Sequence, residues 1–167
     1  MPFRQLVKKR WVKFTLEIAF FVLLFIALRA YMQKDMVRGE APPIQAVTLS
    51  GAEFSLQDST RPILVHFWAT WCGICKLEQG SIESISRDYP VMTIAMQSGS
   101  NEEIQAFLEE HQLTFAVIND DDGELSRQYG VSGVPASFII ASNGEIVSVE
   151  RGYTTEWGLR ARLWLAK

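Results

Sequence analysis

The longest apolar run of the chain lies near its amino terminus, where residues 18–28 carry no polar side chain. A helix from Trp11 to Tyr31 would measure about 30 Å, which matches the hydrocarbon core of a bilayer. Glu17 interrupts the pattern, but it lies about one helical turn from Lys13 and could pair with it near the membrane boundary. The pattern therefore predicts a transmembrane helix.

The charges that flank this run predict its orientation. Positive side chains are denser before the run than after it, where acidic residues offset them. Basic residues collect on the cytoplasmic side of membrane proteins, so the body of the chain should face outward, which in a bacterium is the periplasm. A cleaved secretory signal is the alternative, but it needs small residues before the cut, and Arg29 stands where one is wanted. We therefore expect an uncleaved anchor.

Beyond the anchor, the polar segment "MQKDMVRGEAPP" ends in two prolines, which predicts a linker. Two alternating runs around Ser50-Gly51 indicate a hairpin, and the continuous apolar run "PILVHFW" indicates a buried central strand. Further strands are predicted for "VMTIAM", "FAVI" and the two runs around Asn143-Gly144. Helices are predicted for Cys72–Asp88, for the segment opened by "SNEE", for "DGELSRQYG" and from Thr155 onward, where Trp157, Ala161 and Trp164 share one face.

This alternation of strands and helices, followed by a hairpin and a closing helix, predicts an α/β fold with a mixed sheet and helices on its faces. The 167 residues, 48% of them hydrophobic, have room for one globular domain and an appendage. The predicted boundaries are 1–13 for a basic cytoplasmic segment, 14–30 for the transmembrane anchor, 31–43 for the linker and 44–167 for the globular domain.

The charge of the chain excludes one class of function. The formal net charge of −3 is small, and the body of the chain has no basic stripe with interleaved aromatic residues. Such a stripe is the usual electrostatic footprint of a nucleic-acid-binding protein. We therefore expect no nucleic-acid partner.

The chain has two cysteines, Cys72 and Cys75, which follow the predicted central strand at the start of a predicted helix. The exposed N–H groups and the positive dipole end of a helix favour a thiolate at this position. In such motifs the pKa of a thiol falls from about 8.5 to between about 3.5 and 7.5, which creates an attacking species near neutral pH. Cys72 is therefore the expected nucleophile and Cys75 the resolving thiol, which displaces a mixed disulfide from within the same turn.

Three other interpretations of the pair remain open. A structural disulfide would close so short a loop that it would stabilise the fold little. A zinc site needs two more ligands, and the histidines are His66, in the predicted central strand, and His111, on a distant helix. A copper(I) site suits soft thiolates, and Met92 and Met96 could share one strand face, although strand methionines usually fill a core. We expect no metal site and no bound cofactor.

The segments "VHFWATWCGICKLE" and "GVSGVPASFII", together with the hairpin "NGEIV", resemble the thioredoxin fold. More closely, residues 44–167 are similar to the membrane-anchored bacterial thiol–disulfide proteins of the TlpA, ResA and DsbE kind, including the ScsD-like proteins encoded with suppressors of copper sensitivity. The resemblance implies a thioredoxin-like three-layer α/β/α domain and a redox-active disulfide between Cys72 and Cys75.

Several residues outside the cysteine pair are also expected to take part in its chemistry or in partner binding. The resemblance implies a cis peptide at Val134–Pro135; since proline lacks an N–H, neighbouring backbone groups could pair with an extended partner segment. A trans proline that starts an edge strand is the alternative. The resemblance also implies that Glu78, three residues after Cys75, tunes the thiols and moves protons, although a helix glutamate is often just a solvated residue. Trp71 is expected to be exposed in a partner-binding surface beside the thiols.

Two departures from the resemblance bear on the chemistry. Ile74 stands between the cysteines where proline is usual, and this change is expected to alter the redox potential. His66 occupies the strand position where thioredoxins carry a buried acid and this branch often carries asparagine. A histidine there could accept or relay the proton of Cys75, because its usual pKa is about 6.5. A buried neutral ring bonded to the backbone is the alternative.

Together these features predict a single-pass protein of the bacterial inner membrane, with a thiol–disulfide oxidoreductase domain in the periplasm. The resemblance implies that the protein works as a reductant. A membrane electron-transfer protein would re-reduce the pair, which would pass electrons to cysteine-containing periplasmic proteins in cytochrome c maturation or copper-stress protection. A copper(I) carrier of thioredoxin-like shape, using the same thiols, is the alternative function, and a non-catalytic adaptor is a third.

Overall fold

The computed structural model describes residues 2–166, and the side chains of these residues except 2–10 and 12. The basic side chains Arg4, Lys8, Lys9 and Arg10, which contribute to the predicted orientation, lie outside this set. The chain forms two compact units, a helical one that ends at Lys34 and a globular one that begins at Asp35. Each is described by itself.

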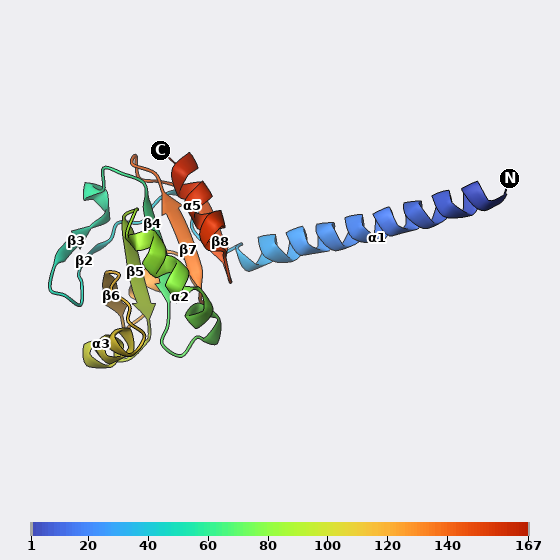
Figure 1. The fold of residues 1–167 in the computed structure, drawn as a ribbon. Coiled ribbons are helices and arrows are strands. Elements are labelled where there is room, and N and C mark those ends of the chain that lie inside the picture. Colours follow the sequence, from blue (N-terminus) through green and yellow to red (C-terminus); the bar gives the residue numbers. More distant parts are fainter. Residues whose placement is uncertain (1, 167) are drawn as a thin grey trace. The chain divides into compact units, whose positions relative to one another are not determined.

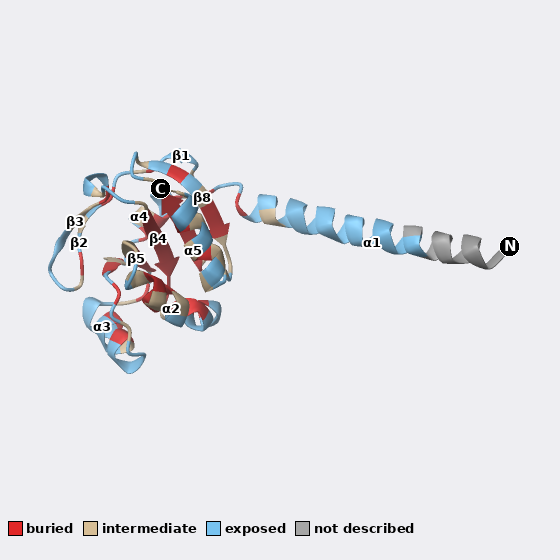
Figure 2. Ribbon diagram, turned by 45° about the horizontal axis from the view of Figure 1, so that its top comes forward, coloured by how far each residue is buried: buried red, intermediate tan, exposed pale blue. Residues whose placement is uncertain are grey.

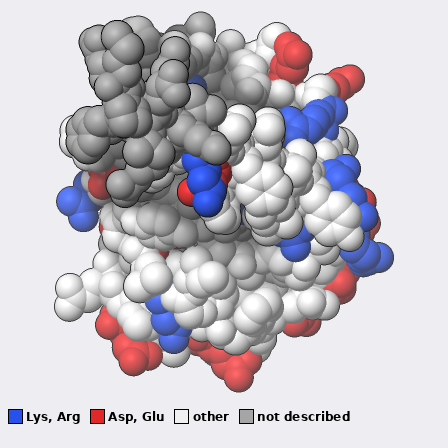
Figure 3. All heavy atoms as spheres, turned by 90° about the vertical axis from the view of Figure 1, so that its right-hand side faces the viewer, with Lys and Arg blue, Asp and Glu red and all other residues white. Residues whose placement is uncertain are grey.

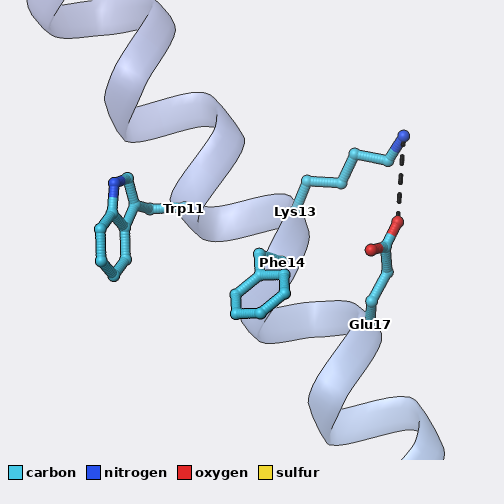
Figure 4. A pocket seen from close by; sticks show the side chains of 4 residues that line it. All are labelled: Trp11, Lys13, Phe14 and Glu17. Carbon is cyan, nitrogen blue, oxygen red and sulfur yellow. Dashed lines mark ion pairs between the residues drawn. The ribbon is translucent and has the colours of Figure 1, made fainter.

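The helical unit consists of α1 (Pro2–Met32), the long blue helix of Figure 1. Its segment Lys13–Met32 is long and apolar enough to cross a membrane, judged by length and composition. Lys13 and Glu17 point toward one another one helical turn apart (Figure 4), with 3.9 Å between Nζ and Oε1. The predicted pairing of Glu17 with Lys13 is therefore confirmed.

A six-stranded mixed sheet forms the centre of the globular unit, with the strand order β1-β8-β7-β4-β5-β6. Strand β4 is parallel to β5, and β5 to β6, whereas the β4–β7, β7–β8 and β8–β1 pairs are antiparallel. The strands of this sheet are β1 (Gly39–Glu40), β4 (Ile63–Trp68), β5 (Val91–Met96), β6 (Val117–Asp120), β7 (Ala136–Ile140) and β8 (Glu145–Arg151). The predicted hairpin around Ser50-Gly51 forms a separate ribbon of β2 (Gln45–Val47) and β3 (Glu53–Ser55).

Helices cover both faces of the sheet. The side chains of β4 alternate between two core clusters: Val65 and Phe67 join one, and Leu64 and Trp68 join the other. The second cluster includes side chains of α2, α3 and α5, whereas α4 contributes Leu125 to the first. Figure 2 shows the central strands as the buried layer. The helices are α2 (Gly73–Ser86), α3 (Asn101–Glu110), α4 (Glu124–Gln128) and α5 (Glu156–Leu165), with a 3-10 turn at Leu56–Asp58. The predicted three-layer thioredoxin-like fold is confirmed.

The predicted linker at 31–43 differs from the structure. Helix α1 continues to Met32, and the segment from Asp35 onward belongs to the globular unit. Met36 and Ala41 are buried in a core cluster, and β1 pairs with the edge of β8. The polar composition of the segment concealed this, because two apolar residues and one strand pair are enough to dock it. The globular unit thus begins nine residues before the predicted boundary at Ile44.

A glycine makes this docking possible. The carbonyl of Asp35 passes so close to Gly130 that a side chain there would collide with it, and Gly130 has a φ of +67°. Both conditions favour glycine. The N–H of Val37 then donates to the carbonyl of Tyr129 at 3.2 Å. The end of α4 and the start of the globular unit are therefore fastened to each other.

Helix α5 begins where the sequence predicts, because the Thr155 hydroxyl accepts from the N–H of Gly158 at 3.2 Å and caps it. Trp157 and Trp164 lie on its outer side, 83% and 64% exposed. Leu159 and Leu163 face the core instead. The tryptophan spacing therefore identifies the helix but marks its solvent-facing side.

Candidate functional site

The two cysteines lie where β4 gives way to α2. Cys72 is the N-cap residue of α2, and its Sγ accepts a hydrogen bond from the N–H of Cys75 at 3.1 Å. The two sulfurs are joined in a disulfide, with the Cα atoms 5.3 Å apart. The position satisfies one of the free N–H groups at the start of the helix with a sulfur, and it places that sulfur at the positive end of the helix dipole.

The surroundings distinguish the two sulfurs and the two tryptophans. Cys75 is fully buried, whereas Cys72 keeps a small exposed surface. Trp71, immediately before Cys72, is 62% exposed, and its indole N–H donates to the carbonyl of Gln97 at 3.0 Å. Trp68 is buried and donates to the hydroxyl of Thr93 at 3.1 Å. The predicted exposure of Trp71 is therefore confirmed.

The fold brings the start of β7 against the cysteines. The Val134–Pro135 peptide is cis, and the carbonyl oxygen of Val134 lies 3.7 Å from the Sγ of Cys72. Val134 is half-buried and packs against both core clusters. The expected cis peptide is therefore present, and the trans alternative is wrong. The backbone before Pro135 is a direct neighbour of Cys72.

Glu78 is completely buried, although it lies on a helix that also has a solvated side. Its Oε2 accepts from the N–H of Thr154 at 3.0 Å, in the segment that leads into α5. Its Oε1 has no hydrogen-bond partner among the described residues. Burial raises the pKa of Glu78 from 4.5 to about 7, against the opposing effect of the Thr154 hydrogen bond. The solvated-residue alternative for Glu78 is therefore wrong.

His66 lies on β4 beneath α2 and is almost completely buried. Its Nδ1 is 2.9 Å from the hydroxyl of Ser137 on β7, so its partner is a side chain and not the backbone. Its Nε2 is 3.8 Å from the Oε1 of Glu78. Burial lowers the pKa of His66 from 6.5 to about 3. At neutral pH the ring is uncharged, so its contact with Glu78 is not an ion pair.

Two residues of this site have no clear signal in the sequence. Ser137 meets His66 because β4 and β7 pair in a register that sets the two residues opposite each other. Thr154 meets Glu78 through a backbone N–H, which any residue except proline would supply. The only hint in the sequence is the place of Ser137, two residues after Pro135, where the alternation of extended backbone puts both side chains on the same side of the chain.

Outside the cysteine site, metal-ligating side chains and surface charge give little sign of further chemistry among the described residues. In the part of the chain that the structure describes, no three His, Cys, Asp or Glu side chains gather in a group that could hold a metal ion. The face in Figure 3 carries acidic and basic side chains in small separate groups among uncharged ones.

The fold and the cysteine pair define the class of this protein, which is a thioredoxin-like thiol–disulfide oxidoreductase. Its sequence places it more narrowly. The chain belongs to the AhpC/TSA family, whose sequence profile matches residues 37–149.

Known relatives agree with this assignment. The chain is 28% identical to a thioredoxin-like protein of Haemophilus influenzae over 162 residues, which cover 95% of this chain and 96% of that protein. It is 27% identical to the thiol–disulfide oxidoreductase ResA of Bacillus cereus over 79% of this chain and 81% of ResA. The crystal structure of StoA from Bacillus subtilis superimposes with a TM-score of 0.66 at 25% identity, covering 72% of this chain and 96% of StoA. The resemblance to the ResA branch is confirmed.

Proposed function

We propose that this protein is tethered to the bacterial inner membrane by α1 and that its globular unit, in the periplasm, exchanges disulfides with other proteins and works as a reductant. The observation that carries the proposal is the disulfide of Cys72 and Cys75 at the amino end of α2, beside the cis Val134–Pro135 peptide. The length and apolar composition of Lys13–Met32 support the tether.

The arrangement supports a two-step exchange. The Cys72 thiolate attacks a disulfide of the partner, so that a mixed disulfide forms and one partner sulfur leaves with the electron pair. Cys75 then attacks the Sγ of Cys72, the Cys72–partner bond breaks, and the second partner sulfur leaves. Two electrons and two protons have passed to the partner, which gains two thiols, and the Cys72–Cys75 disulfide is the product.

The second step needs a base, because Cys75 is buried and attacks only as a thiolate. We assign this role to Glu78, one helical turn further along α2, which receives the proton of Cys75. Its pKa of about 7 suits the task, because the carboxyl can hold or release a proton near neutral pH. His66, 3.8 Å from Glu78, supports that carboxyl from β4.

The partner docks over the exposed side of the disulfide. Trp71 supplies a large exposed aromatic surface next to Cys72 in the chain, and the carbonyl of Val134 also lies close to the Cys72 sulfur. An extended segment around the partner's cysteine would pair with the backbone near Pro135 and pack on the Trp71 indole.

The reductant direction is supported by the resemblance to anchored relatives that a membrane electron-transfer protein keeps reduced. The substrates we propose are cysteine-containing periplasmic proteins of cytochrome c maturation or of copper-stress protection. Thiol trapping of the full chain in cells tests the direction: a reductant is found mostly as the dithiol, whereas an oxidant is found mostly as the disulfide.

The exchange itself is tested by a Cys75→Ala variant of the full chain, expressed in cells and analysed on non-reducing gels. Because the variant cannot resolve a mixed disulfide internally, partners should accumulate as adducts of Cys72 that a reducing agent releases. A Cys72→Ala, Cys75→Ala double variant is the matched control and should trap nothing. The absence of any adduct specific to the single variant would refute the proposed exchange.

Copper(I) titration separates exchange from the copper-carrier alternative, which would use the same thiols. The reduced full chain is expected to transfer electrons to a model disulfide while a competing copper(I) chelator keeps the metal. Tight binding of one equivalent of copper(I) together with negligible exchange would favour the carrier.

A further inference from the structure

Two buried polar atoms lie close to each other where β4 contacts α2. The Nε2 of His66 and the Oε1 of Glu78 are 3.8 Å apart, and each lacks a hydrogen-bond partner among the residues that the structure covers. His66 lies on β4 and Glu78 on α2, so the contact joins the sheet to the helix that carries the cysteines. A buried polar atom without a partner is energetically unfavourable, so the pair favours an arrangement that satisfies both atoms.

One proton satisfies both atoms. A protonated Glu78 donates from Oε1, and an uncharged His66 accepts at Nε2, provided that the two atoms approach by about 1 Å to ordinary hydrogen-bond distance. Burial supports this distribution, because it favours the neutral forms of both groups. The two side chains then carry no net charge in their buried setting.

Ser137 determines which nitrogen of His66 faces Glu78. Its hydroxyl lies 2.9 Å from Nδ1, and the two residues are direct neighbours across the β4–β7 pair. If Ser137 accepts from the N–H at Nδ1, then Nε2 is the unprotonated nitrogen, which is the one that can accept from Glu78. A hydroxyl at position 137 can accept from Nδ1–H and so can hold the tautomer that the shared proton requires.

The neighbours of this group are polar but already engaged. On β5, the Thr93 hydroxyl lies on the other side of His66, donates to Ala116 and accepts from Trp68. On β8, Glu150 lies opposite Ser137 and forms an ion pair with Arg162 of α5 at 2.8 Å. The segment before α5 supplies the N–H of Thr154, which is bonded to Glu78. Cys75 lies one helical turn before Glu78 on α2. Glu150 and Arg162 compensate each other, which leaves Glu78 and His66 as the pair that can exchange one proton.

We propose that Ser137 is a positioning residue, which holds His66 so that its Nε2 shares a single proton with Glu78. This inference rests on the proposed function for one point, namely that the proton is the one released by Cys75. When Cys75 attacks Cys72, the proton of Cys75 moves to Glu78, the S–S bond forms, and the partner's sulfur leaves and takes a proton from water. In the oxidised protein, Glu78 keeps this proton and donates it in a hydrogen bond to the Nε2 of His66.

The test uses the oxidised full chain in detergent micelles, without any partner. The carboxyl of Glu78 is followed by ¹³C NMR as the pH is varied, and the ring nitrogens of His66 are followed by ¹⁵N NMR. The expected signature is a proton on Nδ1, a hydrogen-bonded and unprotonated Nε2, and a Glu78 midpoint near pH 7. A wild-type His66 with its proton on Nε2 would overturn the proposal without any variant.

Variants then isolate Ser137. Ser137→Ala should lower the Glu78 midpoint by about one pH unit, because the protonated carboxyl loses its oriented acceptor. Ser137→Thr keeps the hydroxyl, so its Glu78 midpoint should lie close to the wild-type value. Thr93→Val is the matched control, since it removes a buried hydroxyl on the other side of His66 and should leave the midpoint unchanged. An unchanged midpoint in Ser137→Ala, or an equal shift in Thr93→Val, would overturn the proposal.

This outcome is independent of the trapping experiment. A chain that traps partners through Cys72 but shows no effect at Ser137 would lose only the positioning role. A chain that traps nothing but shows the tautomer and the midpoint shift would keep the shared proton and lose the exchange function.

Discussion

Helices α2 and α3 of the globular unit both start with a side-chain cap, and they use it differently. At α3, the Ser100 hydroxyl accepts from the N–H of Glu103, and the Glu103 carboxylate accepts from the N–H of Ser100 at 2.7 Å. At α2, the only cap is the Sγ of Cys72, and the first turn contains no acidic residue. Carboxylates compensate the positive end of the α3 dipole, whereas at α2 the positive end is free to stabilise the thiolate of Cys72. The contrast shows how one physical effect provides stability in one helix and reactivity in the other.

Removing the sulfur cap of α2 should have the largest effect. Cys72→Ser keeps an N-cap side chain of similar size but has no thiolate, so reduction of a model disulfide should fall to the background rate of the assay. Turnover of a fluorescent disulfide peptide by the full chain measures this. Appreciable residual turnover in Cys72→Ser would mean that Cys75 attacks directly.

The buried acid of α2 should make the stability depend on pH. The folded-state pKa of Glu78, about 7, lies above its usual value of 4.5, so the folded protein binds this proton more tightly than the unfolded chain does. The stability from Glu78 is fully present below about pH 4.5 and is lost as the pH rises to about 7, by up to about 3 kcal/mol. Urea unfolding of the oxidised wild type and of Glu78→Gln at pH 4 and pH 8 isolates this term.

His66 should shift stability in the opposite direction. Its folded-state pKa of about 3 lies below its usual value of 6.5, so its contribution is present above pH 6.5 and is lost as the pH falls toward 3. Relative to wild type, His66→Asn should therefore gain stability at pH 4, and Glu78→Gln should gain it at pH 8. The same trend in both variants would contradict the assigned burial effects.

Removing the hydroxyl cap of α3 should cost stability and nothing else. Ser100→Ala loses the capping box and should lower the free energy of unfolding by about 1 kcal/mol. Its rate of disulfide exchange should equal that of the wild type, because α3 contributes no residue to the proposed machinery. A loss of exchange rate at unchanged stability would show that the two helix starts are coupled.

Giving α2 the acidic first turn of α3 should have the smallest effect. Ile74 is exposed between the cysteines, so Ile74→Glu adds a negative charge beside the thiolate. A charge in the first turn is typically worth about 0.3–1 kcal/mol, which corresponds to a rise of about 0.2–0.7 in the pKa of the Cys72 thiol. The thiolate absorbance of the reduced chain at 240 nm measures this, and Ile74→Lys is the matched variant, with an expected shift of opposite sign.

Local patterns predicted most of the fold. The apolar run of β4, the turn residues Ser50-Gly51 and Asn143-Gly144, and the capping residues Ser100 and Thr155 each identify an element from its own residues. The cysteine spacing likewise fixes the start of α2. These features depend on interactions within a few residues, so they can be recognised without knowledge of the tertiary structure.

Contacts between distant segments could not be predicted. The hydrogen bond between His66 and Ser137 joins residues 71 positions apart and depends on the register of β4 with β7. The burial of Glu78 depends on the segment before α5, which covers it with the N–H of Thr154. The docking of Met36 has no local signal for the same reason, since its partners in the core come from later parts of the chain.

The two-residue strand β1 has a consequence for soluble fragments of this protein. It pairs with Ile146 and Glu145 of β8 and so covers part of one border of the sheet. A fragment starting at Ile44 would leave that border with unsatisfied N–H and C=O groups, which recruit strands from other molecules. It would therefore tend to aggregate, whereas a fragment starting at Asp35 brings its own protective strand.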